Sequence, residues 1–104
     1  MAEAVGMIEV YGLTAAFVAA DAGCKAANVR LEKFDKNKPA NSESLPVPLI
    51  VMVKFRGSVE DVSAAVESAE ISANTITGVI SKHIISRPDY EIEKMLKITG
   101  LDKN

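Results

Sequence analysis

Few residues in this sequence are able to do chemistry, and they are widely spaced. The chain has one cysteine, Cys24, and one histidine, His83. A hydrolytic triad needs a nucleophile, a base and an orienting carboxylate in contact, and no Ser, Cys or carboxylate is placed to complete a triad with His83. Neither metal-ligand spacing nor a glycine-rich phosphate loop is present. We therefore predict no enzyme, no catalytic residue, no metal and no cofactor. Cys24 is interpreted as a small buried hydrophobic side chain and His83 as a structural residue in a strand.

Lys25 stands out because its surroundings are so apolar. It lies towards the end of an alanine-rich stretch, 12–29, whose periodicity predicts a helix. Asp21 precedes it by four residues, the favourable order for a helical ion pair, but an exposed pair of this kind is weak. We expect Lys25 to reach a partner outside its own chain; the alternative is a solvated lysine paired with Asp21. The apolar stripe of this helix is predicted to comprise Leu13, Phe17, Ala20, Cys24 and Ala27.

Length and composition limit the class of protein. The 104 residues suffice for one domain, 1–104. Hydrophobic residues make up 48% of the chain and aromatic residues 5%, so we expect a core of Ala, Val, Ile and Leu. A net charge of −2 offers no basic stripe for nucleic acid. The single cysteine and the lack of a long apolar run predict a soluble, cytosolic protein with no membrane segment.

Alternating apolar residues and turn residues predict the elements that must position these side chains. Strands are expected at 5–11, 29–36, 49–55 and 79–86, with the second at an edge of the sheet and the third at its centre. Helices are expected from Gly12 to about Asn28, from Ser58 to about Thr75, and as a short C-terminal segment after Asp89. This order predicts an α+β, ferredoxin-like (βαββαβ) fold, in which an antiparallel four-stranded sheet carries helices on one face, plus a short C-terminal helix.

The two later helices have recognisable starts and apolar faces. Ser58 with Asp61 three residues later resembles a capping box, and Asp89 is a capping residue for the short helix. The buried stripe of the longer helix is predicted to be Val62, Ala65, Val66, Ala69, Ala73 and Ile76. Its solvated face is predicted to carry Glu60, Asp61, Glu67 and Glu70. In the short helix the inward residues are predicted to be Ile92, Met95 and Leu96, with Glu93 paired to Lys97.

The loop 37–48, NKPANSESLPVP, is the odd feature of the chain. Its three prolines exclude a central strand or a helix interior. Antiparallel strands normally join through two to five residues, and longer loops are usually either functional or disordered. The sequence leaves both readings open.

Three stretches carry a family resemblance: AVGMIEVYGLTAAFVAADAGCKAANV at 4–29, VKFRGSVEDVSAAVESA at 53–69 and HIISRP at 83–88. Together they contain, in order, GMIE, a GLTAA helix opening, the helix end ADAxxKAANV, RGxVxxV and HxIxRP. The chain resembles the single-domain, hexamer-forming shell proteins that tile the facets of bacterial microcompartments. The resemblance implies a non-enzymatic shell component in a microcompartment in the cytoplasm. Its partners would be copies of itself, other shell proteins and encapsulated enzymes.

The same resemblance implies where one hexamer meets the next. Lys25 falls on the family's edge lysine and Arg87 on the arginine of HxIxRP. Asn28 belongs to the same edge, and Asn74 stands where the family often has an arginine. That replacement keeps curved or tubular assemblies open beside flat ones.

A pore on the six-fold axis is also implied, formed by the turn between the second and third strands. Here the 37–48 loop replaces the family's short glycine turn. The residues assigned to the pore are Lys36, Asn37, Lys38, Pro39, Ser42 and Ser44. Six copies of the two lysines would favour small anionic metabolites, whereas six long loops would equally crowd or plug the opening. The rival hypothesis is a ferredoxin-like trimeric signalling protein that binds a small ligand with this loop.

Overall fold

A computed structural model describes residues 3–38, 40, 42–45 and 47–98. Its strands are β1 (Ala4–Tyr11), β2 (Arg30–Leu31), β3 (Asp35–Asn37), β4 (Ile50–Gly57) and β5 (Val79–Ile85). Its helices are α1 (Leu13–Ala26), α2 (Val59–Asn74) and α3 (Tyr90–Leu96), and a 3₁₀ turn, η1, spans Ser42–Ser44. No helix within the described ranges is both long enough and apolar enough to cross a membrane.

The strands form one antiparallel sheet in the order β2-β4-β1-β5, which confirms the predicted ferredoxin-like topology. The expected edge strand is divided into two pieces, since β2 and β3 both pair with β4. Between the pairs Leu31↔Phe55 and Asp35↔Met52 the edge strand advances four residues and β4 only three. One extra residue therefore interrupts the ladder, as in a β-bulge.

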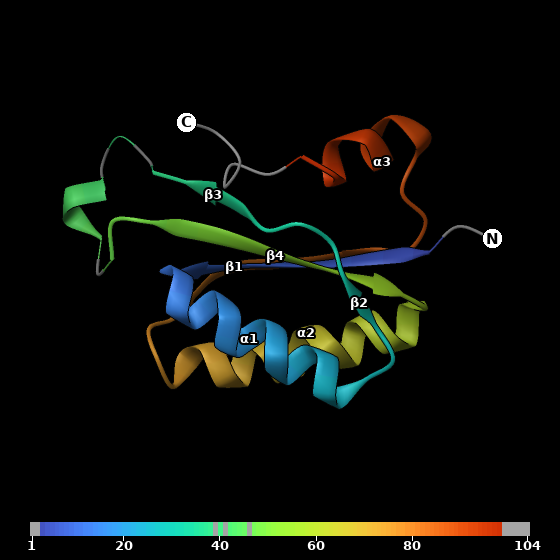
Figure 1. Cartoon of the computed structure of the whole chain (residues 1–104), viewed down its shortest axis with the longest axis horizontal. Helices are drawn as coiled ribbons and strands as arrows, with labels where there is room; N and C mark the ends of the chain where they lie inside the picture. The colour runs from blue at the N-terminus through green and yellow to red at the C-terminus, as the bar shows by residue number, and fades with distance from the viewer. Residues whose placement is uncertain (1–2, 39, 41, 46, 99–104) are drawn as a thin grey trace.

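Helices α1 and α2 cover one face of the sheet, and α3 lies over the opposite face (Figure 1). The buried side of α1 consists of Ala15, Ala16, Ala19, Ala20 and Gly23. The stripe predicted from the sequence was therefore wrong except for Ala20 and the partly buried Ala27. Phe17 is 59% exposed and Leu13 38% exposed, while Cys24 is exposed rather than buried.

Close helix packing explains this inversion. A Cβ added at Gly23 would lie about 2.4 Å from the Phe55 ring and 3.1 Å from the Ala65 carbonyl oxygen. The small side of α1 thus lets the helix approach both β4 and α2, which a side of Leu and Phe would prevent. The helix also stops at Ala26, two residues before the predicted end at Asn28.

Helix α2 follows its predicted pattern. The Ser58 side chain accepts a hydrogen bond from the Asp61 backbone N–H at 3.1 Å, which confirms the cap. Val62, Ala65, Val66, Ala69 and Ala73 are buried as predicted. Ile76 is 47% exposed because α2 ends at Asn74, so that part of the prediction was wrong.

Helix α3 follows its predicted pattern only in part. Asp89 caps it by accepting from the Glu91 N–H at 3.1 Å, and Leu96 is buried. Met95 is 63% exposed and Ile92 37% exposed, so their predicted inward orientation was wrong. Glu93 pairs with Arg56 of β4 instead of Lys97.

Substituting Gly23→Ala tests the close approach of α1. Alanine favours a helix by about 1 kcal/mol over glycine. The extra methyl group overpacks the site against Phe55, so we expect a net loss of about 1–2 kcal/mol in the free energy of unfolding, measured by urea denaturation. Gly78→Ala is the control, because a Cβ there meets only Tyr11 at 3.6 Å. Net stabilisation by Gly23→Ala would show that the space between α1, β4 and α2 accommodates the extra methyl group.

Candidate assembly edge and pore loop

Lys25 occupies the last turn of α1 and is open to solvent. Its ammonium lies 2.8 Å from the Asp21 carboxylate, with the two side chains 77% and 62% exposed. The hydrogen bond from Lys25 to Asp21, followed by their charge attraction, raises the pKa of Lys25. Within its own chain, Lys25 therefore makes the surface pair that the sequence offered as the alternative, and the exposed ammonium stays accessible to a neighbouring molecule.

Asn28 ties the end of α1 to the start of α2. Its backbone N–H donates to Asp61 Oδ1 at 3.4 Å, while the other oxygen of Asp61 accepts from the Ser58 hydroxyl at 2.9 Å. The Asp61 carboxylate thus bonds both the capping residue of α2 and the segment that follows α1. This contact positions Lys25 and Asn28 at the end of the sheet where β4 finishes.

Arg87 lies at the same end of the sheet but beyond its other edge. The pairs Val5↔Ile85 and Ala4↔Gly57 bring the end of β5 level with the end of β4. Arg87 follows β5 and is exposed. Of the four predicted edge residues, Lys25, Asn28 and Arg87 therefore share one end of the domain.

Asn74 lies at the opposite end. It is the last residue of α2, and the turn after it is held by Thr77, whose hydroxyl donates to the Tyr11 carbonyl oxygen at 2.7 Å. Tyr11 ends β1, next to Gly12, whose N–H donates to the Leu49 carbonyl oxygen at 2.8 Å. Leu49 closes the 37–48 loop, so Asn74 is grouped with the loop and not with Lys25.

The described part of the loop contains the end of β3 and a 3₁₀ turn. Lys36 and Asn37 belong to β3, pairing with Val51 and Ile50, and Ser42 and Ser44 bound the turn η1. Lys36, Asn37, Lys38 and Ser44 are exposed. Pro39 lies outside the described residues.

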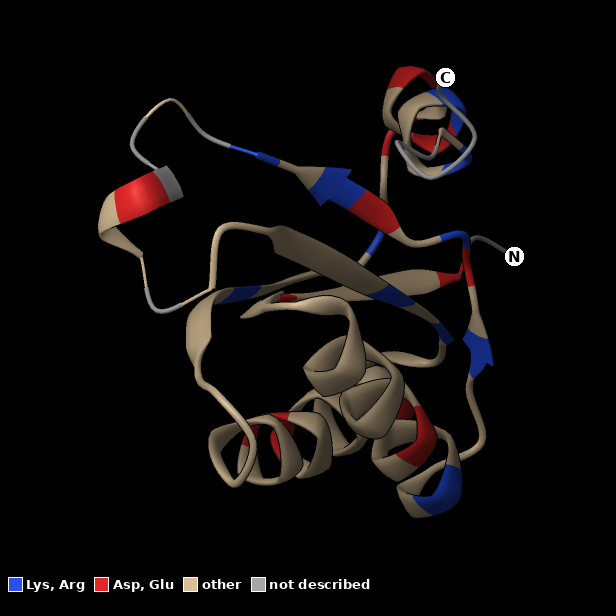
Figure 2. Ribbon diagram, turned by 60° about the vertical axis from the view of Figure 1, so that its left-hand side comes forward, with Lys and Arg blue, Asp and Glu red and all other residues tan. Residues whose placement is uncertain are grey.

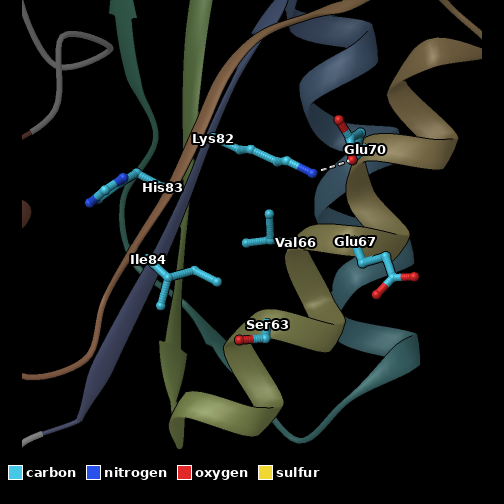
Figure 3. A pocket seen from close by; sticks show the side chains of 7 residues that line it. All are labelled: Ser63, Val66, Glu67, Glu70, Lys82, His83 and Ile84. Atoms are coloured by element: carbon cyan, nitrogen blue, oxygen red, sulfur yellow. Dashed lines mark hydrogen bonds and ion pairs between the residues drawn. The ribbon is translucent and has the colours of Figure 1, made fainter.

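Two of the hollows formed by the described residues are large. One of about 510 Å³ is lined by loop residues Lys38, Ala40, Glu43, Leu45 and Pro48. The other, of about 460 Å³, lies between α2 and β5 (Figure 3). There Lys82 reaches across to Glu70 at 2.6 Å, while His83 points away from the groove.

The described residues include no group of three or more His, Cys, Asp and Glu side chains that is placed to hold a metal ion. The thiol of Cys24 is exposed, but partial burial and then the nearby Asp21 carboxylate raise the pKa of Cys24. A raised pKa keeps the thiol protonated, which is opposite to the state of a nucleophile or a metal ligand.

Sequence reasoning missed the two buried cations of β4. Lys54 is 2% exposed and Arg56 is 3% exposed, and both point to the face of the sheet opposite α1 and α2. Figure 2 shows Lys and Arg positions along β2, β3 and β4, whereas α2 carries acidic residues. The sequence does carry a signal for them: Lys54 and Arg56 are two residues apart, so in a strand both side chains point to the same face of the sheet.

Arg56 is held by several partners. Its guanidinium donates to both carboxylate oxygens of Glu93, at 2.8 and 2.6 Å, and to the carbonyl oxygens of Glu3 and Ala4. The hydrogen bond to Glu93 is the main reason why the pKa of Arg56 is raised. Lys54 donates to the carbonyl oxygens of Leu96 and Ile98 at 2.8 and 2.9 Å, and burial lowers the pKa of Lys54.

Comparisons with known proteins agree with one another. The BMC domain family matches residues 4–88. The bacterial microcompartment shell protein PduA of Citrobacter freundii is 39% identical over 94 residues, 90% of this chain and 91% of that protein. The carboxysome shell protein CcmK2 of Synechocystis sp. is 39% identical over 100 residues, 94% of this chain and 88% of that protein.

A solved structure supports the fold. The crystal structure of a microcompartments protein from Desulfitobacterium hafniense matches with a TM-score of 0.69 and 24% identity. The match covers 93% of this chain and 48% of that one, so this chain spans about half the length of that solved protein.

Substituting Asp21→Asn tests the environment of Cys24 and Lys25. Removing the carboxylate lowers the pKa of Cys24 and raises its thiolate fraction, so the rate of reaction with an aromatic disulfide reagent at pH 8 should increase roughly twofold or more. Glu67→Gln, which makes the same change in net charge on α2, should leave the rate unchanged. Equal rates for Asp21→Asn and the unsubstituted protein would show that Asp21 does not control this thiol.

Proposed function

The chain belongs to the BMC domain family of bacterial microcompartment shell proteins, and we propose that it forms cyclic hexamers that tile the facets of a shell. A structural role in a microcompartment is the function that its relatives share. The ring of six is the assembly that the family resemblance implies. Its partners are other copies of the chain and other shell proteins, and its location is the shell of a microcompartment in the cytoplasm.

The observation that carries this proposal is the pair of unlike apolar flanks at the two edges of the sheet. On the flank formed by α1 and β2, exposed residues include Leu13, Phe17 and Leu31. On the flank formed by α2 and β5 they include Ile71, Ile76 and Ile80. Two different patches on opposite sides suit a head-to-tail contact, and such contacts close into rings when the rotation permits.

The orientation of each protomer in the ring follows from the positions of the loop and of Lys25. The 37–48 loop and Lys25 lie at opposite ends of the domain. A ring with the loop at its axis therefore turns Lys25, Asn28 and Arg87 outwards, where a neighbouring hexamer would lie. The lysine stem can lie along a flat apolar border while its ammonium bonds carbonyl oxygens of the neighbour. Asn74, at the loop end, is left out of this border.

The central pore is proposed to be lined by the loop, with small polar metabolites as its cargo. Six copies of the exposed Lys36 and Lys38 would place positive charge around the axis and favour anions. Asn37 and Ser44 would supply polar groups along the same segment, which also includes Ser42. Enzymes enclosed by the shell would produce or consume the metabolites that pass.

Lys25→Ala tests the border and the ring together. We expect native mass spectrometry to give a hexamer for both proteins, and electron micrographs to show extended sheets only for the unsubstituted one, because the border loses its bridging cation. Lys94→Ala is the control, since Lys94 is an exposed lysine in a helical ion pair on the other face of the sheet. A trimer or a lone protomer at high concentration would overturn the hexamer, and sheets that survive in Lys25→Ala would overturn the border assignment.

Replacing 37–48 by a short glycine turn tests the pore. The ring should persist, because its flanks are untouched, while small-ion conductance of hexamers in a planar membrane changes. The double substitution Lys36→Gln and Lys38→Gln keeps the loop length and should reduce anion preference alone. Dissolution of the ring on shortening would identify the loop as an assembly element instead.

A further inference from the structure

The face of the sheet opposite α1 and α2 carries two cations that are buried beneath α3. Lys54 and Arg56 alternate along the central strand β4, and each is almost fully buried. Glu93 of α3 neutralises Arg56 through a two-bond fork, while the carbonyl oxygens of Leu96 and Ile98 accept from Lys54. Lys54 therefore binds the carbonyl end of α3, where the helix dipole favours a positive charge.

Few apolar contacts hold α3 in place. Leu96 is its only buried residue, whereas Tyr90 is 72% exposed and Met95 63% exposed. Leu96 and Val5 are buried but lie outside the main hydrophobic cluster between the sheet, α1 and α2. A helix of seven residues is not stable on its own in water, so charged hydrogen bonds must supply much of what holds α3.

We propose that α3 is a releasable latch that can open while the rest of the domain stays folded. The Glu93–Arg56 pair and Lys54 hold it on the face of the sheet opposite α1 and α2. This inference is independent of the proposed ring and pore. Opening uncovers two cations side by side on β4.

The open state leaves the cations partly compensated. Arg56 keeps its hydrogen bonds to the carbonyl oxygens of Ala4 and Glu3, and Glu32 lies 3.9 Å from its guanidinium. Lys54 is close enough to Asp35 and Glu32 for both carboxylates to raise its pKa against the effect of burial. In the closed state the hydrogen bond from Arg56 lowers the pKa of Glu93, so the fork is charged at neutral pH. When α3 is away, Arg56 would therefore retain hydrogen-bond acceptors, and Lys54 would retain nearby carboxylates.

Native-state amide hydrogen exchange on Glu93→Gln tests the latch. The substitution keeps the shape of the side chain but removes its charge. We expect exchange at the amides of α3 to accelerate roughly ten- to a hundredfold, the factor that corresponds to losing a charged hydrogen-bond pair, with β4 and α1 unchanged. Glu91→Gln is the matched control, because Glu91 sits on the same helix and, among the described residues, its side chain pairs with the exposed Lys94 at 3.5 Å.

Two results would overturn the latch. If α3 exchanges at the same rate in Glu93→Gln and in the unsubstituted protein, the fork does not hold the helix. If α3, β4 and α1 accelerate together, α3 opens only when the whole domain unfolds. The unchanged protection of β4 and α1 also serves as the check that Glu93→Gln folds.

Discussion

The close approach of α1 to β4 and α2 is the constraint on which the rest of the structure depends. Alanine and glycine line the contact, and at Gly23 there is no room for even one more methyl group against Phe55. Because the inward side of α1 is built from the smallest residues, its larger apolar side chains point outwards. The same packing that closes the core therefore creates the apolar flank of Leu13 and Phe17.

This arrangement links folding to the proposed assembly. Phe17 is 59% exposed, yet its ring lies 5.2 Å from that of Phe34, which belongs to the irregular segment between β2 and β3. The flank is thus supported from within the domain, while much of its apolar surface stays free for a neighbour. A domain that tiles needs such flanks, since burying apolar surface is the main driving force for association.

The two faces of the sheet are stabilised in different ways. Under α1 and α2 the contacts are apolar and closely packed, whereas under α3 they are largely ionic. Close packing ties α1 and α2 to a single arrangement. The contacts beneath α3 depend on a few charged partners, so the loss of one partner removes a large share of them, which is the basis for proposing that α3 opens.

The sequence by itself determined the order of elements, the caps at Ser58 and Asp89 and the buried stripe of α2, because these follow from local spacing and from capping by residues close in sequence. Only the tertiary structure decided which side of α1 faces inward, that Glu93 pairs with Arg56 and that Asn74 lies at the same end of the domain as the loop. An alanine-rich helix with apolar residues on several sides has no unique inward face until its neighbours occupy the space. Ion pairs between strands and helices likewise join residues far apart in the chain, and helical spacing cannot reveal them.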